Sequence, residues 1–364
     1  MGRSDVDNDS SNAYKEGSVT QLEDTARALV APGKGILAAD ESTGTIKKRF
    51  DSIHLESTED NRRAYREMLF RTPTLGDHIS GVILYDETIR QSAEDGTPFV
   101  KVLADAGMIP GIKVDTGAKQ LAAFPGELVT EGLDGLRERF ADYAKLGARF
   151  AKWRAVINIG ARSSEASPAD RIPTSFCIDA NVHALARYAA LAQEAGLVPI
   201  VEPEILMDGD HTIERCYDAT LATLRALFDE LYRHRVSCEG TLLKTNMVLP
   251  GTECSQQATP GQIAEQTIRC FRNAVPPAIP GIVFLSGGQA DIPATENLNE
   301  MNSLGPHAWE LSFSYGRALQ APALKAWKGE PANVEAGQHE LLHRAKCNGA
   351  ARDGRYSKEL EAAA

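Results

Sequence analysis

The chain has 364 residues, of which 43% are hydrophobic and 24% charged, a composition typical of a globular protein with a full core. Its formal net charge of −11 at pH 7 argues against nucleic acid as the main partner, and an anionic substrate would need a local basic site. No run of about 18 apolar residues occurs, which argues against a transmembrane helix and a membrane partner.

The cysteines show no C-x-x-C pairing, and the first residues of the chain lack the apolar segment of a secretory signal. Scattered cysteines in a chain of this length are typical of reduced thiols inside cells. We therefore expect a soluble, cytoplasmic protein. The cysteines are Cys177, Cys216, Cys238, Cys254, Cys270 and Cys347.

Eight short apolar runs alternate along the chain with longer stretches of helical apolar spacing, such as Leu133–Leu146, Asn181–Glu194 and Thr220–Tyr232. This alternation predicts parallel βαβ units, and eight of them indicate a single (β/α)8 TIM barrel, with a doubly wound sheet as the alternative. The apolar runs are Gly35–Asp40, Ile79–Tyr85, Met108–Val114, Phe150–Asn158, Leu197–Ile205, Gly240–Leu249, Gly281–Ser286 and Leu311–Tyr315.

The two ends extend beyond a minimal barrel. Residues 1–20 are polar and acidic and are expected to form a flexible arm that leads into a helix at Leu22–Val30. Residues 21–345 would form the barrel with its extra helices. Residues 346–364, rich in alanine and glycine, are expected to form a mobile C-terminal tail.

The sixth apolar run carries Lys244 in its middle. Strands of a parallel sheet are buried on both faces, and a lysine is almost never fully buried without a partner. Burial disfavours the charged ammonium form and favours a neutral amine, which is what a Schiff-base nucleophile requires. The alternative is a lysine at the strand end whose ammonium group reaches solvent.

The other strands also end in groups suited to chemistry, and a barrel gathers such groups at the C-terminal ends of its strands. Residues two apart share one face of a strand, so Lys152 points the same way as Arg154, and Glu202 the same way as Glu204. Lysines beside carboxylates can have their pKa values driven apart, as acid–base chemistry needs. The resulting candidates are Asp40, Lys113, Lys152, Arg154, Glu202, Glu204 and Lys244.

Two further groups are suited to phosphate. Glycines and an arginine follow the seventh and eighth strands, where barrels commonly bind phosphate; these residues are Ser286, Gly287, Gly316 and Arg317. The basic run Lys47-Lys48-Arg49 follows Ser42 and Thr45 and could hold a second phosphate across the mouth.

Each feature taken alone has an ordinary structural explanation. Asp40 could cap a helix, the glutamate pair could be solvated, and the basic run could be an exposed helix face. The histidines do not cluster at strand ends, and His339 and His343, one helical turn apart, are interpreted as surface residues. We therefore expect no metal and no other cofactor.

Seven segments resemble class I fructose-1,6-bisphosphate aldolase, and the resemblance runs from about residue 20 to residue 345. They are Ala31–Thr43, Gly111–Asp115, Gly147–Arg154, Leu197–Ile205, Leu242–Lys244, Phe284–Gln289 and Phe313–Leu319.

The resemblance implies a metal-independent lyase of glycolysis and gluconeogenesis. It would cleave a sugar bisphosphate reversibly into two triose phosphates, dihydroxyacetone phosphate and glyceraldehyde 3-phosphate, and would assemble as a homotetramer. It implies that Lys244 forms the Schiff base and that Glu202 is the general acid in carbinolamine dehydration. Asp40 would take the proton from the C4 hydroxyl, Lys152 would stabilise charge, and Glu204 would hold the lysine network.

The resemblance also implies two phosphate sites. Ser286, Gly287, Gly316 and Arg317 would bind the C1 phosphate. The C6 end would be served by Ser42, Thr45, Lys113 and Arg154, with Lys48 and Arg49 more loosely.

The chain departs from the family pattern at two positions. Thr245 follows the expected Schiff-base lysine where a proline is common, and the last tyrosine is Tyr356 instead of a terminal one. A transaldolase or another Schiff-base barrel aldolase remains the second enzymatic interpretation. A non-catalytic scaffold role is the alternative from another class.

Overall fold

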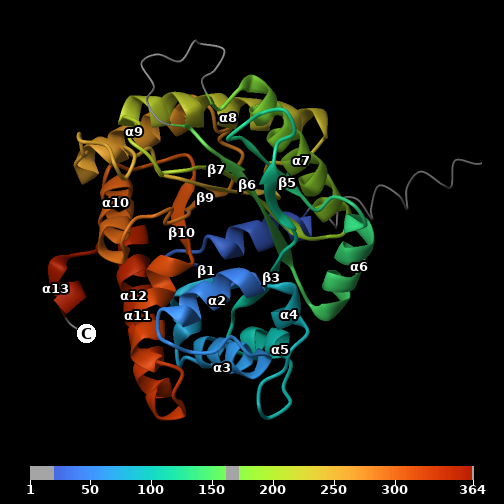
Figure 1. The fold of residues 1–364 in the computed structure, drawn as a ribbon, viewed down its shortest axis with the longest axis vertical. Coiled ribbons are helices and arrows are strands. Elements are labelled where there is room, and N and C mark those ends of the chain that lie inside the picture. The colour runs from blue at the N-terminus through green and yellow to red at the C-terminus, as the bar shows by residue number, and fades with distance from the viewer. Residues whose placement is uncertain (1–19, 161–171, 363–364) are drawn as a thin grey trace, which may run out of the picture.

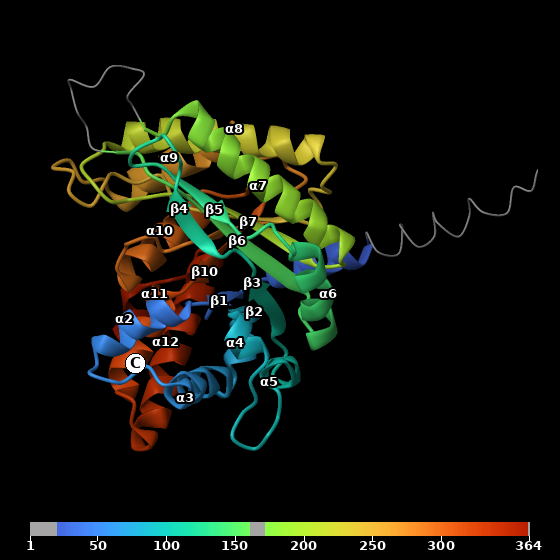
Figure 2. The same ribbon diagram turned by 45° about the vertical axis from the view of Figure 1, so that its right-hand side comes forward.

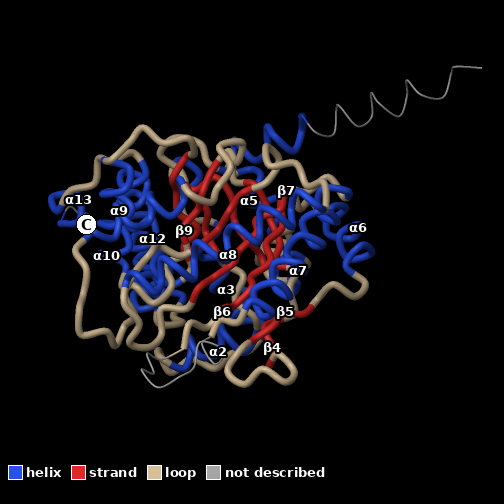
Figure 3. Tube along the Cα trace, turned by 90° about the horizontal axis from the view of Figure 1, so that it is seen from above, coloured by secondary structure: helices blue, strands red, loops and turns tan. Residues whose placement is uncertain are grey.

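The computed structural model describes residues 20–160 and 172–362. Eight parallel strands close into a barrel in the order β1-β10-β9-β8-β7-β6-β3-β2, with helices packed around the outside (Figures 1 and 3). The barrel strands are β1 (Gly35–Ala38), β2 (Ile79–Leu84), β3 (Ile109–Lys113), β6 (Phe150–Ile157), β7 (Val198–Ile205), β8 (Leu242–Thr245), β9 (Gly281–Phe284) and β10 (Glu310–Tyr315). Each overlaps one of the eight predicted runs, so the predicted closed barrel is confirmed and the doubly wound sheet is wrong.

At least one helix separates each barrel strand from the next. None in the described part of the chain combines the length and apolarity needed to cross a membrane. Residues 20–29 are also helical. The other helices are α2 (Thr43–Asp51), α3 (Glu59–Phe70), α4 (Asp86–Ile89), α5 (Phe99–Asp105), α6 (Leu136–Leu146), α7 (Ser175–Glu194), α8 (Ile213–Arg233), α9 (Pro260–Arg272), α10 (Asp291–Ser303), α11 (Arg317–Trp327), α12 (Val334–Arg352) and α13 (Lys358–Ala362).

Local sequence fixes where several of these helices begin. Thr174, Thr212 and Thr259 each precede a helix, and each threonine hydroxyl accepts a hydrogen bond from a backbone N–H of the first turn. At α9 the cap is a full capping box with Gln262, and Pro260 opens the helix where its missing N–H costs nothing. The helices on this side of the barrel therefore have well-defined starts.

Strand alternation divides the apolar residues into an inner and an outer core. Odd-numbered residues flanking Lys152, such as Trp153, pack outward against the helices in the larger cluster. Even-numbered residues such as Phe150, Ile200 and Leu242 point inward and form a separate cluster with Leu22, Leu29 and others of the N-terminal helix. The barrel interior therefore has an apolar floor, and the charged side chains further along the same strands lie above it.

Two parts of the fold differ from the sequence prediction. An antiparallel hairpin of β4 (Gly117–Gln120) and β5 (Leu128–Glu131) lies between β3 and α6 and packs beside β6 and α7 (Figure 2). Its strands are only four residues long and carry no apolar run, so the sequence does not predict them.

The predicted start of the C-terminal tail, at residue 346, lies too early in the chain, because helix α12 continues to Arg352. Residues 346–352 belong to α12, where Cys347, Asn348 and Ala351 are buried, so small residues here pack a helix instead of loosening the chain. The short helix α13 follows, and only the last two residues of the predicted tail lie outside the described part. The predicted N-terminal arm also lies outside it, apart from residue 20.

The close contact of Gly111 with Phe150 gives a test of the inner core. A Cβ atom on Gly111 would lie 2.3 Å from Cζ of Phe150, whose ring also lies against Gly81. We expect Gly111→Ala to lower the free energy of unfolding by about 1–3 kcal/mol through overpacking. Urea unfolding of the variant and the unaltered protein measures this.

Gly261→Ala is the matched control, because the nearest atom to its Cβ would be 3.8 Å away, in the side chain of Glu300. This change in α9 should be neutral or stabilising by about 0.5–1 kcal/mol. Adding Phe150→Leu should relieve the Gly111→Ala defect. An undiminished defect in that background would contradict the steric explanation.

Candidate active site

A cavity of about 590 Å3 opens at the C-terminal ends of the barrel strands. Every predicted site residue lines it, from Asp40 after β1 to Arg317 after β10. Among the described residues that line it, seven are lysine or arginine and five are aspartate or glutamate. The cavity therefore carries a formal excess of positive charge within a protein of net charge −11, which is the local basic site that an anionic substrate needs.

A continuous chain of ion pairs joins four side chains at the centre of the cavity, of which Lys152, Glu202 and Lys244 are buried and Asp40 is partly buried. Lys152 Nζ lies 2.7 Å from Asp40 Oδ2 and 3.2 Å from Glu202 Oε2. The other carboxylate oxygen of Glu202, Oε1, lies 3.2 Å from Lys244 Nζ. Glu202 thus bridges the two lysines, and the two lysine side chains are matched by two carboxylates.

The side chains of this network are almost fully withdrawn from water, with Lys244 5% exposed and Lys152 and Glu202 each 4% exposed. Burial alone would raise the pKa values of Asp40 and Glu202, but the ammonium groups of Lys152 and Lys244 outweigh it and lower both values. Burial alone would lower the pKa of Lys152, yet the carboxylates of Asp40 and Glu202 raise it. Asp40 and Glu202 are therefore held as carboxylates and Lys152 as an ammonium.

A second layer of ion pairs lies beside this network. Glu204 pairs with Nε of Arg154. Burial alone would lower the pKa of Arg154, but the Glu204 carboxylate outweighs this effect and raises the pKa. The expectation that Glu204 holds the lysine network is wrong in this detail, because the carboxylate that contacts both lysines is Glu202.

Asp115, which the sequence does not single out, supports two of the predicted cations. Its Oδ1 lies 2.6 Å from Lys113 Nζ, and its Oδ2 accepts a hydrogen bond of 3.1 Å from the backbone N–H of Arg154. Asp115 lies two residues after Lys113, just beyond the end of β3, and this spacing is the signal that could have found it.

The groups expected to bind the C1 phosphate follow β9 and β10 and line the same cavity. Ser286 is buried just after β9, and Gly287 and Gly288 follow with positive φ values of 52° and 96° that glycine adopts without strain. Gly316 caps the N-terminus of α11, and Arg317 is the first residue of that helix. Backbone N–H groups and a helix N-terminus together form a surface suited to an anion.

Comparison with known proteins agrees with this geometry. The sequence model of the family described as "Fructose-bisphosphate aldolase class-I" matches residues 21–364. The chain is 59% identical over 340 residues to a "Probable fructose-bisphosphate aldolase class 1" of Xylella fastidiosa, an alignment that covers 93% of this chain and 99% of the relative. It is 54% identical to the "Fructose-bisphosphate aldolase 1" of Toxoplasma gondii over 92% of this chain and 91% of the relative.

The chain belongs to the class I fructose-bisphosphate aldolases. A solved structure of the Plasmodium falciparum aldolase, in complex with TRAP and a small-molecule inhibitor, superposes with a TM-score of 0.90 at 50% identity. The superposition covers 94% of this chain and 96% of that one. The (β/α)8 barrel is therefore the aldolase barrel, and the protein is a lyase of glycolysis.

The sequence prediction also misses the role of Glu41 in the aldolase site. This buried carboxylate lies 2.5 Å from Arg49 Nη1 and 2.6 Å from Arg66 Nη1, and it accepts a hydrogen bond from Gln320. Arg49 comes from α2 and Arg66 from α3, so Glu41 joins both helices to the end of β1. Arg49 is positioned by this carboxylate at the rim of the cavity.

Two features near the aldolase site take no part in the ion-pair network. A cavity of about 770 Å3 lies between α10, α11 and α12, but of the predicted site residues only Arg317 lines it. Tyr356 does not line the active-site cavity; its hydroxyl donates a hydrogen bond of 2.8 Å to Glu361 in α13. The last tyrosine of the chain therefore packs against the C-terminal helix.

Removing the charge of Glu41 should destabilise the protein in a pH-dependent way. Burial alone would raise the pKa of Glu41, but Arg49 and Arg66 lower it below the ordinary 4.5. Its stabilising effect is therefore fully present above about pH 4.5 and is lost as the pH falls through the lowered pKa. We expect Glu41→Gln to cost about 3–5 kcal/mol of unfolding free energy at pH 7, because it leaves buried guanidinium charge unpaired.

Urea unfolding at pH 7, 5, 4 and 3 measures this difference, which should shrink at the two lowest values. Glu265→Gln, an exposed position in α9, is the control and should stay within about 0.5 kcal/mol of the unaltered protein. A difference for Glu41→Gln that is the same at every pH would contradict the assignment to the carboxylate charge.

Proposed function

We propose that Lys244 carries the aldolase reaction by adding to the ketone carbon of fructose 1,6-bisphosphate and forming an imine. The observation that supports this is the contact of Lys244 Nζ with Glu202 Oε1 at 3.2 Å, inside a cavity of excess positive charge. The ammonium form must lose a proton before it can attack. Glu202, which is held as a carboxylate, is the nearest group to accept that proton.

Glu202 then returns the proton to the hydroxyl group that leaves the carbinolamine as water. This shuttle reconciles its lowered pKa with the role of a general acid, since the acid is formed during the reaction and is not present at rest. Lys152 stays protonated beside Glu202. After Lys244 has given its proton to Glu202, the positive charge of Lys152 still balances the carboxylate of Asp40.

Asp40 accepts the proton of the C4 hydroxyl as the bond between C3 and C4 breaks. The electron pair of that bond passes into the protonated imine, which becomes an enamine, and glyceraldehyde 3-phosphate leaves. Asp40 suits this step because its ion pair with Lys152 keeps it ionised. Protonation of the enamine at C3 and hydrolysis of the imine then release dihydroxyacetone phosphate and restore the lysine.

The two phosphates are assigned to two different sets of residues that line the cavity. Ser286, Gly287, Gly316 and Arg317 would bind the C1 phosphate, and Ser42, Thr45, Lys113, Arg154, Lys48 and Arg49 would serve the C6 end. The second set favours a bisphosphate over the single-phosphate substrates of other Schiff-base barrel enzymes. No described feature favours a scaffold role over catalysis.

We also propose a cytoplasmic homotetramer whose catalytic step is independent of metal. The family resemblance supports the tetramer and the metal independence. The six cysteines are all free, which is consistent with a reducing compartment.

Trapping the imine tests the role of Lys244. Borohydride reduction in the presence of dihydroxyacetone phosphate should give one adduct per chain, located on Lys244 by peptide mass mapping, with and without EDTA. Lys244→Met should abolish both the adduct and cleavage, because no other amine replaces the missing nucleophile. An adduct on Lys48, Lys113 or Lys152, which line the same cavity, would show that the wrong lysine has been assigned.

Two neighbouring lysines test the C6 phosphate site. Lys48 lines the cavity, whereas Lys47 does not and instead lies 2.8 Å from Asp51. We expect Lys48→Ala to raise the KM for fructose 1,6-bisphosphate by roughly tenfold, about 1.4 kcal/mol, while the KM for fructose 1-phosphate changes little.

Lys47→Ala removes the same charge from the adjacent residue and should leave both constants unchanged. Steady-state cleavage of the two substrates by the three proteins measures this. Equal effects of the two variants would mean that Lys48 acts only through its charge at a distance, without contacting the phosphate. An equal effect of Lys48→Ala on the KM of both substrates would remove Lys48 from the C6 site.

A further inference from the structure

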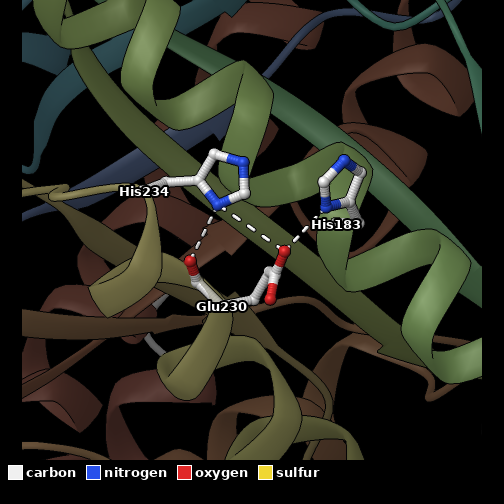
Figure 4. Close-up of side chains that lie close together, drawn as sticks. All are labelled: His183, Glu230 and His234. Atoms are coloured by element: carbon white, nitrogen blue, oxygen red, sulfur yellow. Dashed lines mark hydrogen bonds and ion pairs between the residues drawn. The ribbon is translucent and has the colours of Figure 1, made fainter.

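We propose that His183, Glu230 and His234 form a binding site for a transition-metal dication of the zinc class on the outer surface of the barrel. The sequence suggests no such set, because His183 is far from the other two in the chain. The fold brings them together: His183 lies on α7, Glu230 on the last turns of α8 and His234 immediately after α8 (Figure 4). We call this group the helix clasp.

The ligand atoms of the helix clasp already converge. His183 Nδ1 lies 2.6 Å from Glu230 Oε1, and His234 Nδ1 lies 3.6 Å from the same oxygen. One nitrogen or oxygen of each residue lies within 4.8 Å of the others. Tetrahedral zinc, with bonds of about 2.0–2.1 Å, needs ligand atoms about 3.3 Å apart, so small side-chain rotations bring the three onto one ion.

The residue types select the ion. Two imidazoles and one carboxylate are ligands preferred by Zn2+ and its neighbours in the first transition row, whereas Mg2+ and Ca2+ prefer oxygen alone. Three protein ligands leave a further position for water. His234 Nδ1 lies 2.9 Å from the backbone carbonyl oxygen of Glu230, so binding through this nitrogen requires its proton to move to Nε2.

The surroundings of the helix clasp permit a cation to enter. The side chain of His183 is 53% exposed and that of His234 23%, so water and ions reach both rings. Of the lysines and arginines in residues 20–160 and 172–362, Arg233 alone pairs with Glu230, and it lies 3.3 Å from Oε2, not from the oxygen that both histidines face. Its side chain is 74% exposed and can turn away, and the net charge of −11 favours binding of a cation.

The helix clasp is separate from the aldolase site, since none of its three residues lines the active-site cavity. A bound ion would link α7 to the end of α8 by bonds that the unfolded chain cannot make at once. An ion that binds only the folded protein, and not the unfolded chain, stabilises the folded state by mass action. The proposal therefore does not depend on the proposed catalytic roles.

Isothermal titration of the EDTA-treated, full-length protein with ZnCl2 tests the site, with thermal unfolding at each zinc concentration as a second readout. We expect one saturable site per chain and a Tm that rises with zinc but not with MgCl2. His183→Ala should weaken the affinity at least about tenfold, since even the loss of an outer-shell partner costs 10–100-fold. Circular dichroism shows whether the variant is folded.

Two control variants separate the helix clasp from other zinc ligands. His339→Ala removes an exposed histidine of α12 and should change nothing. His343→Ala disrupts the group of His343, Cys347 and Glu361, where ligand atoms also converge, and it too should leave the binding intact.

Co2+ added in place of zinc should give visible absorption bands that disappear in His183→Ala. Zinc binding that survives His183→Ala but is lost in His343→Ala would overturn the proposal. So would the absence of saturable binding in the unaltered, folded protein.

Discussion

Closure of the barrel is the constraint on which the site depends. Because successive residues of a strand point to opposite faces, closing eight strands sends Lys152, Glu202 and Lys244 into one narrow interior. Below them Phe150, Ile200 and Leu242 exclude water. A charge in such a place is tolerated only when it is paired, and the two lysines and two carboxylates of the network balance one another. The interior that stabilises the barrel therefore also holds the charged groups of this network in fixed contact.

Charges at the rim of the cavity are also paired, because carboxylates contact the cations there. Glu41 holds Arg49, Asp115 holds Lys113, and Glu204 holds Arg154. Each pairing fixes a flexible side chain before a substrate arrives, so less conformational entropy is lost on binding. The pairings leave a modest excess of positive charge at the mouth. An anionic substrate thus meets a basic, ordered surface on a protein whose overall field would repel it.

The sequence predicts the strands well because eight buried apolar runs leave few alternatives. It also predicts that Lys152 and Arg154 share a face, since the two-residue period needs no tertiary information. It fails where partners come from other elements. Nothing local shows that Glu202 contacts both lysines and Glu204 an arginine, or that Glu41 joins α2 to α3. The hairpin β4–β5 is too short and polar to give a periodic signal, and the alanine- and glycine-rich end of α12 resembles a loose tail until its burial is known.

The two central lysines differ in a way that composition alone could not reveal. In the described part of the chain Lys152 contacts two carboxylates, at 2.7 and 3.2 Å, whereas Lys244 contacts one, at 3.2 Å. Loss of a proton from Lys152 would break two buried ion pairs, and loss of one from Lys244 would break a single pair. The same closed interior therefore holds Lys152 between two carboxylates and Lys244 against one, a difference that supports the proposed assignment of Lys244 as the nucleophile and Lys152 as the fixed charge. In the proposed mechanism the proton released by Lys244 passes to Glu202, which Lys152 also contacts and holds in place.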